Sequence, residues 1–239
     1  MVLFALAIAP GIAISLYIFF KDEYNREPRR HIFISFLLGV LSALPAIILQ
    51  YILLPVENFL LPVGILSIAI KAFFIVALTE EWCKYMMVRY YAYRQPEFDE
   101  PFDGIVYGVM VSMCFATIEN IAYVMQFGYH TAIVRMFISV PAHACFGVLM
   151  GYHMGTAKFH KGHPFPYLMR GLFLAILFHG SFDFFLFLKD STYVKEHVSD
   201  LFLIGGALLS LFVALRLSRK AIREHMELSR EMHNPPADV

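Results

Sequence analysis

Apolar residues dominate the chain in long runs, which are separated by short segments rich in charge, proline or glycine. A membrane helix needs about 20 mostly apolar residues to cross about 30 Å of hydrocarbon. Seven runs reach this length, over residues 2–20, 32–54, 64–90, 104–126, 131–156, 167–188 and 200–217. The pattern predicts an all-α, polytopic membrane bundle of about seven transmembrane helices. Residues 1–217 would form one transmembrane domain, and residues 218–239 a charged cytoplasmic tail.

Composition agrees with this prediction and excludes a soluble enzyme. The chain of 239 residues is 59% hydrophobic and only 16% charged, whereas a typical soluble chain is roughly 25% charged. Its mean hydropathy is +0.64. Nineteen Lys and Arg residues balance 19 Asp and Glu residues, so net charge favours no nucleic-acid partner. Cys83, Cys114 and Cys145 lie in apolar runs without CxxC spacing, which is typical of small apolar core residues.

Basic residues gather in alternate loops, and this asymmetry predicts the orientation. Lys and Arg mark cytoplasmic loops, and they concentrate in segment 21–31, in the third-to-fourth and fifth-to-sixth connections, and after residue 215. We therefore expect a multi-pass protein of the bacterial cell membrane with its N-terminus outside and its C-terminus in the cytoplasm. The first run, without a basic leader or a cleavage site, is expected to be a retained anchor. Opposite charges four residues apart in 216–233 predict a surface helix.

Ionisable residues inside the predicted membrane helices carry the candidate chemistry. Such groups are costly in hydrocarbon, so each is a functional hypothesis. Four of the seven helices contain them, together with one amide: Glu80, Glu81, Lys84, Glu119, Asn120, His143, His179 and Asp183. At a rise of about 1.5 Å per residue, all fall in the middle layer of a core of about 30 Å. This common depth predicts one polar intramembrane cavity.

Histidine and carboxylate side chains at this depth indicate a metal site. Neutral imidazoles and carboxylates are the ligands of catalytic zinc sites that keep one position open for water. The candidate ligands are Glu119, His143, His179 and Asp183. Asp183 follows His179 by one helical turn, so it could also orient the imidazole instead of binding zinc. No HExxH motif is present, so a metalloprotease here would be of an unusual class.

The adjacent glutamates indicate acid–base chemistry. Glu80 and Glu81 point about 100° apart on a helix, so one can face a cavity while the other supports it. A buried glutamate can take a proton from water and return it to a leaving amine. Lys84 would supply the counter-charge, and Asn120 a donor for a developing oxyanion. The inventory predicts water-dependent amide hydrolysis inside the membrane.

Other interpretations of the same residues remain open at this point. Glu80 and Lys84 could form a structural ion pair, His143 could be a hydrogen-bonded core histidine, and Asn120 could bridge helices. Buried Glu, His and Asp also make the proton relays of proton-coupled transporters and channels. Transporters often show internal repeats, and this sequence shows none. A binding module without catalysis would not need the full set of acid, base and ligand types.

Several motifs in a fixed order resemble those of the PrsW family of polytopic bacterial membrane proteases. They are Ala9-Pro10-Gly11-Ile12, the segment 21–28, Glu80-Glu81-x-x-Lys84, Asp103-Gly104-Ile105-Val106-Tyr107-Gly108, Phe115-x-x-x-Glu119-Asn120, His143-Ala144 and His179-x-x-x-Asp183. Together they span nearly the whole chain.

The resemblance implies a glutamate-dependent intramembrane peptidase, usually classed as a metalloprotease. It implies Glu80, Glu81 and His179 as catalytic residues, with Glu119, His143 and Asp183 lining the site or binding metal. It also implies a single-pass anti-sigma factor as substrate, cut in the first of two steps after envelope stress. Segment 21–28 has no assigned chemistry. We further expect Gly147 to leave room for an extended substrate.

Overall fold

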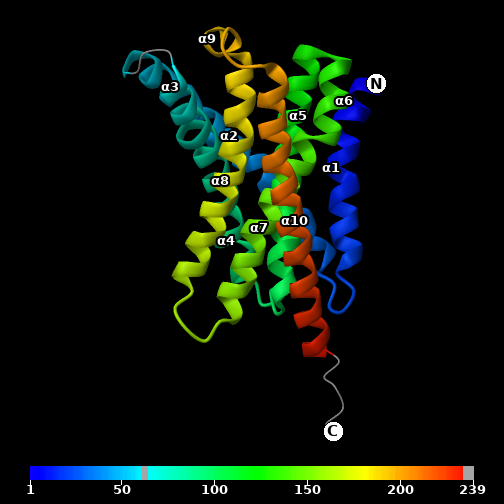
Figure 1. Ribbon diagram of the computed structural model, residues 1–239. Helices are drawn as coiled ribbons and strands as arrows, with labels where there is room; N and C mark the ends of the chain where they lie inside the picture. The colour runs from blue at the N-terminus through cyan, green and yellow to red at the C-terminus, as the bar shows by residue number, and fades with distance from the viewer. Residues whose placement is uncertain (61–63, 234–239) are drawn as a thin grey trace.

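A computed structural model describes residues 1–60 and 64–233, and every regular element in those ranges is a helix. The elements are α1 (Val2–Lys21), α2 (Arg29–Leu60), α3 (Ile65–Ile70), the π-helix η1 (Lys71–Ala77), α4 (Leu78–Tyr90), the short 3-10 helix η2 (Ala92–Arg94), α5 (Pro101–Phe127), α6 (Tyr129–Phe137), α7 (Ser139–Phe159), α8 (Phe165–Asp190), α9 (Thr192–Lys195) and α10 (Asp200–His233). The long helices run along one axis, and the N-terminus and the C-terminal end of α10 lie at opposite ends (Figure 1). The predicted all-helical fold is confirmed.

Six helical segments within the described residues are long and apolar enough to cross a membrane: Val2–Lys21, Arg29–Glu57, Pro101–Phe127, Tyr129–Phe159, Phe165–Asp190 and Asp200–His233. They coincide with six of the seven predicted runs. The remaining run, 64–90, is also helical but is divided into α3, η1 and α4. The chain is therefore a multi-pass membrane protein.

A π-helix interrupts the run that was expected to be one regular helix. Residues 65–90 are helical without a gap, but Lys71–Ala77 form hydrogen bonds with π-helical spacing. Such segments are rare and occur mostly at functional sites, because they alter the faces that the following residues present. Glu80 and Glu81 follow within one turn of η1, at the start of α4. The π-helix therefore sets the direction of the paired glutamates.

The predicted span 131–156 is likewise broken in two. α6 ends at Phe137 and α7 begins at Ser139, with Ile138 between them outside α-helical geometry (φ −120°, ψ −64°). Pro141 lies in the first turn of α7, where its missing N–H disturbs no intrahelical bond. On either side of the break, both α6 and α7 contact α5.

α10 is longer than the last predicted span. Its 34 residues run without interruption from Asp200 to His233, which is about 51 Å at 1.5 Å per residue. A bilayer core of about 30 Å holds only part of this length. The predicted span 200–217 and the predicted surface helix over 216–233 are thus one continuous helix.

Glycines bring α5 and α7 into close contact at the centre of the bundle. A Cβ atom added to Gly104 would overlap the carbonyl oxygen of Gly151, and one added to Gly151 would overlap that of Gly104. Small residues at such spacing are typical of tightly packed membrane helices. Gly147 belongs to the same contact, because its added Cβ would lie 2.8 Å from the Cβ of Ser112 and 2.9 Å from Gly108 O. The expectation that Gly147 makes room for substrate is therefore wrong.

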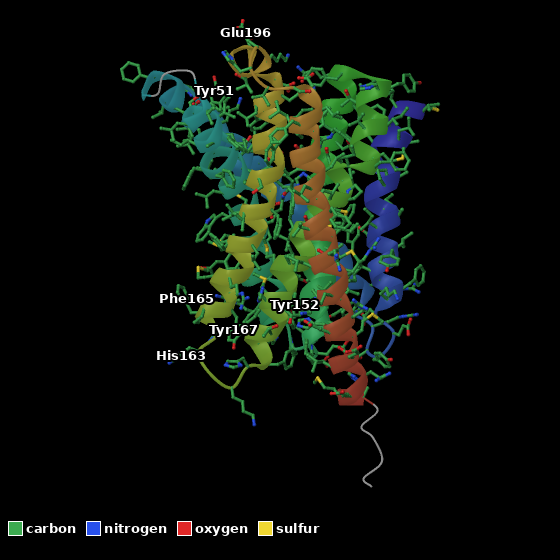
Figure 2. All side chains as sticks on the ribbon, viewed as in Figure 1. Tyr51, Tyr152, His163, Phe165, Tyr167 and Glu196 are labelled. Carbon is green, nitrogen blue, oxygen red and sulfur yellow. The ribbon has the colours of Figure 1, made fainter. Side chains whose placement is uncertain are left out.

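The loops alternate between the two ends of the bundle. Tyr51 on α2 and Glu196 after α9 lie at one end, whereas His163 and Tyr167 lie at the other (Figure 2). The basic connection between α7 and α8 is thus separated from the segment that joins α8 to α10 by the length of the bundle.

Candidate active site

Side chains from four helices meet halfway along the bundle. α4 provides Glu80, Glu81 and Lys84, α5 provides Glu119, α7 provides His143, and α8 provides His179 and Asp183. Ligand atoms of Glu80, Glu81, His143 and His179 all lie within 4.8 Å of one another. The structure thus brings together candidates that lie up to 100 residues apart in the sequence.

Glu81 orients His179. The Glu81 side chain is fully buried, and its Oε1 lies 2.8 Å from His179 Nδ1 and 2.7 Å from Lys84 Nζ. Nδ1–H of His179 donates to this carboxylate, which fixes both the ring position and the tautomer. Lys84 is only 1% exposed, so its ammonium neutralises Glu81 in the interior. Glu81 and Lys84 thus hold the His179 ring in a fixed position.

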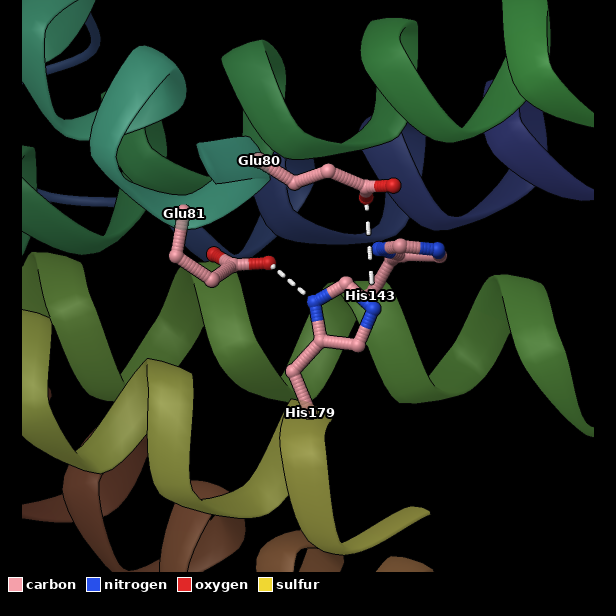
Figure 3. A group of neighbouring side chains, drawn as sticks. All are labelled: Glu80, Glu81, His143 and His179. Atoms are coloured by element: carbon pink, nitrogen blue, oxygen red, sulfur yellow. Dashed lines mark hydrogen bonds and ion pairs between the residues drawn. The ribbon is translucent and has the colours of Figure 1, made fainter. Parts of the chain in front are cut away.

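Glu80 faces the other nitrogen of His179. Its Oε2 lies 3.9 Å from His179 Nε2 and 3.6 Å from Lys84 Nζ, and this buried oxygen accepts no hydrogen bond. Gln50 Nε2 donates to its Oε1 at 3.1 Å. Figure 3 shows the two glutamates reaching the His179 ring from different sides. The His179 imidazole therefore lies between the carboxylate of Glu81, which it hydrogen-bonds, and the carboxylate of Glu80, whose Oε2 has no donor among the described residues.

His143 links the paired glutamates to Glu119. Lys84 Nζ lies 3.2 Å from His143 Nδ1, and His143 Nε2 lies 3.0 Å from Glu119 Oε2. With Lys84 donating to Nδ1, the Nε2–H of His143 donates to Glu119. The ring centroids of His143 and His179 are 5.0 Å apart. Both nitrogens of His143 thus have partners within the cluster.

Arg135 is a member of the site that sequence reasoning missed. Its Nη2 lies 2.8 Å from Glu119 Oε2, and its Nε donates to Asn120 Oδ1 at 2.9 Å. Arg135 was not among the residues that the sequence singled out, although it lies inside the run 131–156, where a charge is a functional hypothesis. Its position within a membrane helix was the available signal.

Asn120 is directed away from the glutamate pair. Its Nδ2 donates to the backbone oxygen of Ala7 on α1 at 2.8 Å, while its Oδ1 accepts from Arg135. The side chain thereby connects α1, α5 and α6. These contacts agree with the helix-bridging interpretation left open by the sequence.

Asp183 lies one helical turn after His179, as expected. Its Oδ2 is 3.3 Å from His179 Nε2, on the same side as Glu80. A neutral His179 that donates from Nδ1 presents a lone pair at Nε2 to both carboxylates. A proton or a metal ion at that point would turn these contacts from unfavourable to favourable. The donor set therefore fits a bound metal.

A cavity of about 530 Å³ adjoins the cluster. Its charged and polar lining residues are Gln50, Lys71, Glu80, Glu119, Tyr123, Arg135, Ser139, His143, His179, Asp183 and Asp190. Glu81 and Lys84 do not line it. This volume lies within the range of ligand sites, about 300 to 1,000 Å³. Of the two adjacent glutamates, only Glu80 reaches the cavity.

Comparison with known proteins identifies the family. The family model described as PrsW family intramembrane metalloprotease matches residues 27–218. The chain belongs to this family. It is 40% identical over 188 residues to Protease PrsW of Geobacillus kaustophilus (strain HTA426), covering 79% of this chain and 81% of that protein. It is 40% identical over 180 residues to Protease PrsW of Bacillus subtilis (strain 168), covering 75% and 80%. No solved structure matches.

Membership of the PrsW family decides between the classes left open by the sequence. The chain is a membrane-embedded peptidase, which confirms the hydrolase interpretation over the transporter and the binding module. A peptidase acts on a protein substrate. In this chain, the buried group of Glu80, Glu81, His143 and His179 offers ligand atoms that could hold the metal ion of a metalloprotease.

Proposed function

We propose that the cavity beside Glu80 is the active site of an intramembrane endopeptidase. The observation that carries this proposal is the position of His179 between two glutamates. One glutamate, Glu81, is fully buried and holds the ring, while Glu80 and the far side of the ring face the cavity. A water held between Glu80 and His179 would meet both an acid–base group and a basic nitrogen.

Each polar residue has a separate role in this reaction. Glu80 takes a proton from the attacking water and returns it to the leaving amine, as a general base and then a general acid. Glu81 and Lys84 keep His179 in one tautomer. Arg135 holds Glu119 beside His143, so that the opposite wall of the cavity keeps its shape. Glu80, Glu81 and His179 are thus the proposed catalytic set.

Zinc is the metal that we propose for this site. His179 and Asp183 would hold it, with His143 and Glu119 as further ligands from the facing helices. When bound, zinc polarises a carbonyl group and makes a coordinated water more acidic. The Oε2 of Glu80, which accepts no hydrogen bond within the described residues, would be free to accept a proton from a water in the cavity. His143 would have to exchange its hydrogen bond to Lys84 or to Glu119 for such a role.

We propose a single-pass membrane anti-sigma factor as the substrate, in agreement with the family resemblance. Peptide bonds in an intact membrane helix are shielded by their own hydrogen bonds, so the cleaved segment must be unwound or lie next to the membrane. The side chains of Phe115, Phe146 and Phe182 line the cavity beside the polar cluster. They would pack against apolar side chains of an extended segment.

The orientation that we propose has the N-terminus outside and the C-terminus in the cytoplasm. It is supported by the alternating basic loops and by the N-terminus and the end of α10, which lie at opposite ends of the bundle. α3, η1 and α4 would then form a seventh crossing, and the cavity would lie within the bilayer.

Co-expression with an epitope-tagged single-pass anti-sigma factor tests the proposed function. We expect a shortened fragment with the wild type and none with Glu80→Gln, Glu81→Gln or His179→Ala at matched membrane levels. Glu196→Gln is the matched control, because Glu196 is exposed at one end of the bundle. Cleavage that survives all three substitutions would place the active site elsewhere.

Removal of metal from the purified protein tests the proposed cofactor. We expect a strong chelator to abolish cleavage and zinc to restore it, whereas Asp183→Asn should weaken zinc binding about 10-fold or more. Full activity after exhaustive chelation would show that Glu80 and His179 activate water without a metal.

A further inference from the structure

A second group of acidic side chains lies far from the active site. Asp22 follows α1, and Glu100 and Asp103 stand at the start of α5. One carboxylate oxygen from each lies within 4.8 Å of the other two. Asp103 and Glu119 are separated by 16 residues of α5, which is about 24 Å along the helix. This group, called here the α1–α5 carboxylate cluster, is therefore distinct from the candidate active site.

These carboxylates are deeply buried. Asp22 and Glu100 are each 1% exposed, and Asp103 is fully buried. Glu27, on the loop between α1 and α2, is 3% exposed and accepts a hydrogen bond from Tyr107. Burying a carboxylate without a compensating partner is costly. Four such groups in one place require positive charge, protons or a bound ion.

Some of their oxygens have protein partners. Asp22 Oδ2 accepts from the backbone N–H of Glu27 at 3.0 Å. Asp103 Oδ2 accepts from the backbone N–H groups of Asp99 and Glu100, each at 2.8 Å, and so caps α5. These bonds fix the directions of the carboxylates and leave their second oxygens unused.

The remaining oxygens of the cluster lack donors. Asp22 Oδ1 and Asp103 Oδ1 are buried and accept no hydrogen bond from the part of the chain that the structure describes. Oε1 of Glu27, which is not one of the three clustered carboxylates, is also buried without a donor. Glu100 Oε2 is paired with His233 Nδ1, at 3.2 Å. Asp22 and Asp103 thus each bring to this cluster a buried oxygen that lacks a donor.

Lysine and arginine side chains do not neutralise this group. Over residues 1–60 and 64–233, no Lys or Arg forms an ion pair with Asp22, Glu27, Glu100 or Asp103. Arg26 donates its Nε–H to the backbone oxygen of Asp22 instead. Burial raises the pKa of Asp22 to about 6 and that of Glu100 to about 7, which reflects the same lack of compensation.

The geometry points to a binding site for a hard divalent cation at Asp22, Glu100 and Asp103. Carboxylate oxygens are the ligands that Ca²⁺ and Mg²⁺ prefer. Ligands at 2.3 to 2.6 Å from Ca²⁺ lie at most about 5 Å apart, and those of Mg²⁺ at most about 4.2 Å. The spread of 4.8 Å therefore suits Ca²⁺ as it stands and Mg²⁺ after a small contraction.

The bound cation would tie three parts of the chain together. Asp22 belongs to the connection after α1, Asp103 to α5, and Glu100 contacts His233 at the end of α10. The ion thus fastens the loop between α1 and α2, and through Glu100 the end of α10, to the most deeply buried of the long helices. This site is independent of the proposed peptidase mechanism.

Thermal unfolding of the full chain in detergent tests this site without relying on activity. After dialysis against a chelator, we expect Ca²⁺ or Mg²⁺ at about tenfold excess over its Kd to raise the Tm by about 3 °C or more. The variant Asp22→Asn/Asp103→Asn should lose this shift, and Glu227→Gln, an exposed acid on α10, should keep it. Separate titrations with Ca²⁺ and Mg²⁺ identify the preferred ion.

Two further variants show whether a cation-dependent change in Tm comes from this cluster or from the active site. If the double variant does not accumulate, Asp22→Asn alone replaces it, because Asp22 lies in a loop. His179→Ala should retain the shift, since the active site is separate. A Tm that responds to neither ion at millimolar concentration overturns the proposal, because the cluster is then satisfied by protons. A shift that survives Asp22→Asn but is lost in His179→Ala also overturns it.

Discussion

Glu80 and Glu81 are neighbours in sequence, but the rotation of about 100° between successive helix residues places them in different surroundings. Glu81 contacts Lys84 and His179 in the dry interior, whereas Glu80 lines the cavity. The sequence predicted that one glutamate would face the cavity and the other would support it. Only the packing of α4 against α2, α5 and α8 distinguishes them, because either rotation satisfies the sequence pattern.

The two glutamates should therefore respond differently to amide substitution. Glu80→Gln should lower the cleavage rate about 100-fold or more, by loss of the general base, with little change in stability. Glu81→Gln should also destabilise the fold, by about 3 kcal/mol, because it leaves the Lys84 ammonium buried without its closest partner. Cleavage rate and thermal unfolding, measured on both variants, separate the effects. Equal stability losses would argue against the assignment of roles.

Arg135 should act by holding Glu119 in place. Arg135→Ala leaves Glu119 and the Asn120 carbonyl without their shared donor, so we expect cleavage to fall about 10-fold or more. Arg135→Lys keeps the charge but cannot bridge both groups, and it should restore part of the rate. The comparison of kcat with KM for both variants is the measurement. Unchanged kcat in Arg135→Ala would exclude this role.

Residues whose partners lie on other helices were the hardest to interpret from the sequence. Glu80, Glu81, Glu119, His143, His179 and Asp183 were found because a charged or polar group in an apolar run is conspicuous. Arg135 was missed because it lies near the start of its apolar run, where a charge is less conspicuous. Gly147 was misinterpreted because the sequence does not say which helix face meets α5. Asp22 and Glu27 lie in segment 21–28, to which the sequence assigned no chemistry, because their burial against α5 is a tertiary property.

At the scale of elements, the long helices were predictable and their interruptions were not. Apolar run length gave the positions of α1, α5 and α8 to within three residues and that of α2 to within six. The π-helix η1 and the break at Ile138 leave no clear mark in an apolar pattern, since both depend on how neighbouring helices pack. Each interruption precedes site residues, Glu80 and Glu81 in one case and His143 in the other.

The glycine contact between α5 and α7 gives a prediction at this scale. Gly151→Ala places a Cβ against the backbone of Gly104 and Ile105, which cannot move aside without shifting α5. We expect a loss of about 1 to 3 kcal/mol in stability. Gly205→Ala on α10 is the matched control, because its added Cβ meets no atom within 4 Å. Thermal unfolding of both variants measures the difference, and equal stability would contradict the packing.

For the whole molecule, the orientation can be tested from the two ends. In a variant in which the three buried cysteines are replaced, Glu196→Cys should react with an impermeant thiol reagent added to intact cells. Lys161→Cys, in the connection between α7 and α8, should react only after the membrane is opened. The reverse pattern would invert the proposed topology, and reaction of both in intact cells would contradict the number of crossings.

The central claim is that Glu80, held beside His179 at the cavity, activates the water that cuts a membrane-protein substrate. The most direct test uses liposomes that contain only the purified protein and an epitope-tagged single-pass anti-sigma factor. We expect one defined cleavage with the wild type, and a rate reduced about 100-fold or more with Glu80→Gln at equal folding and incorporation. Wild-type cleavage by a folded Glu80→Gln variant would contradict the account.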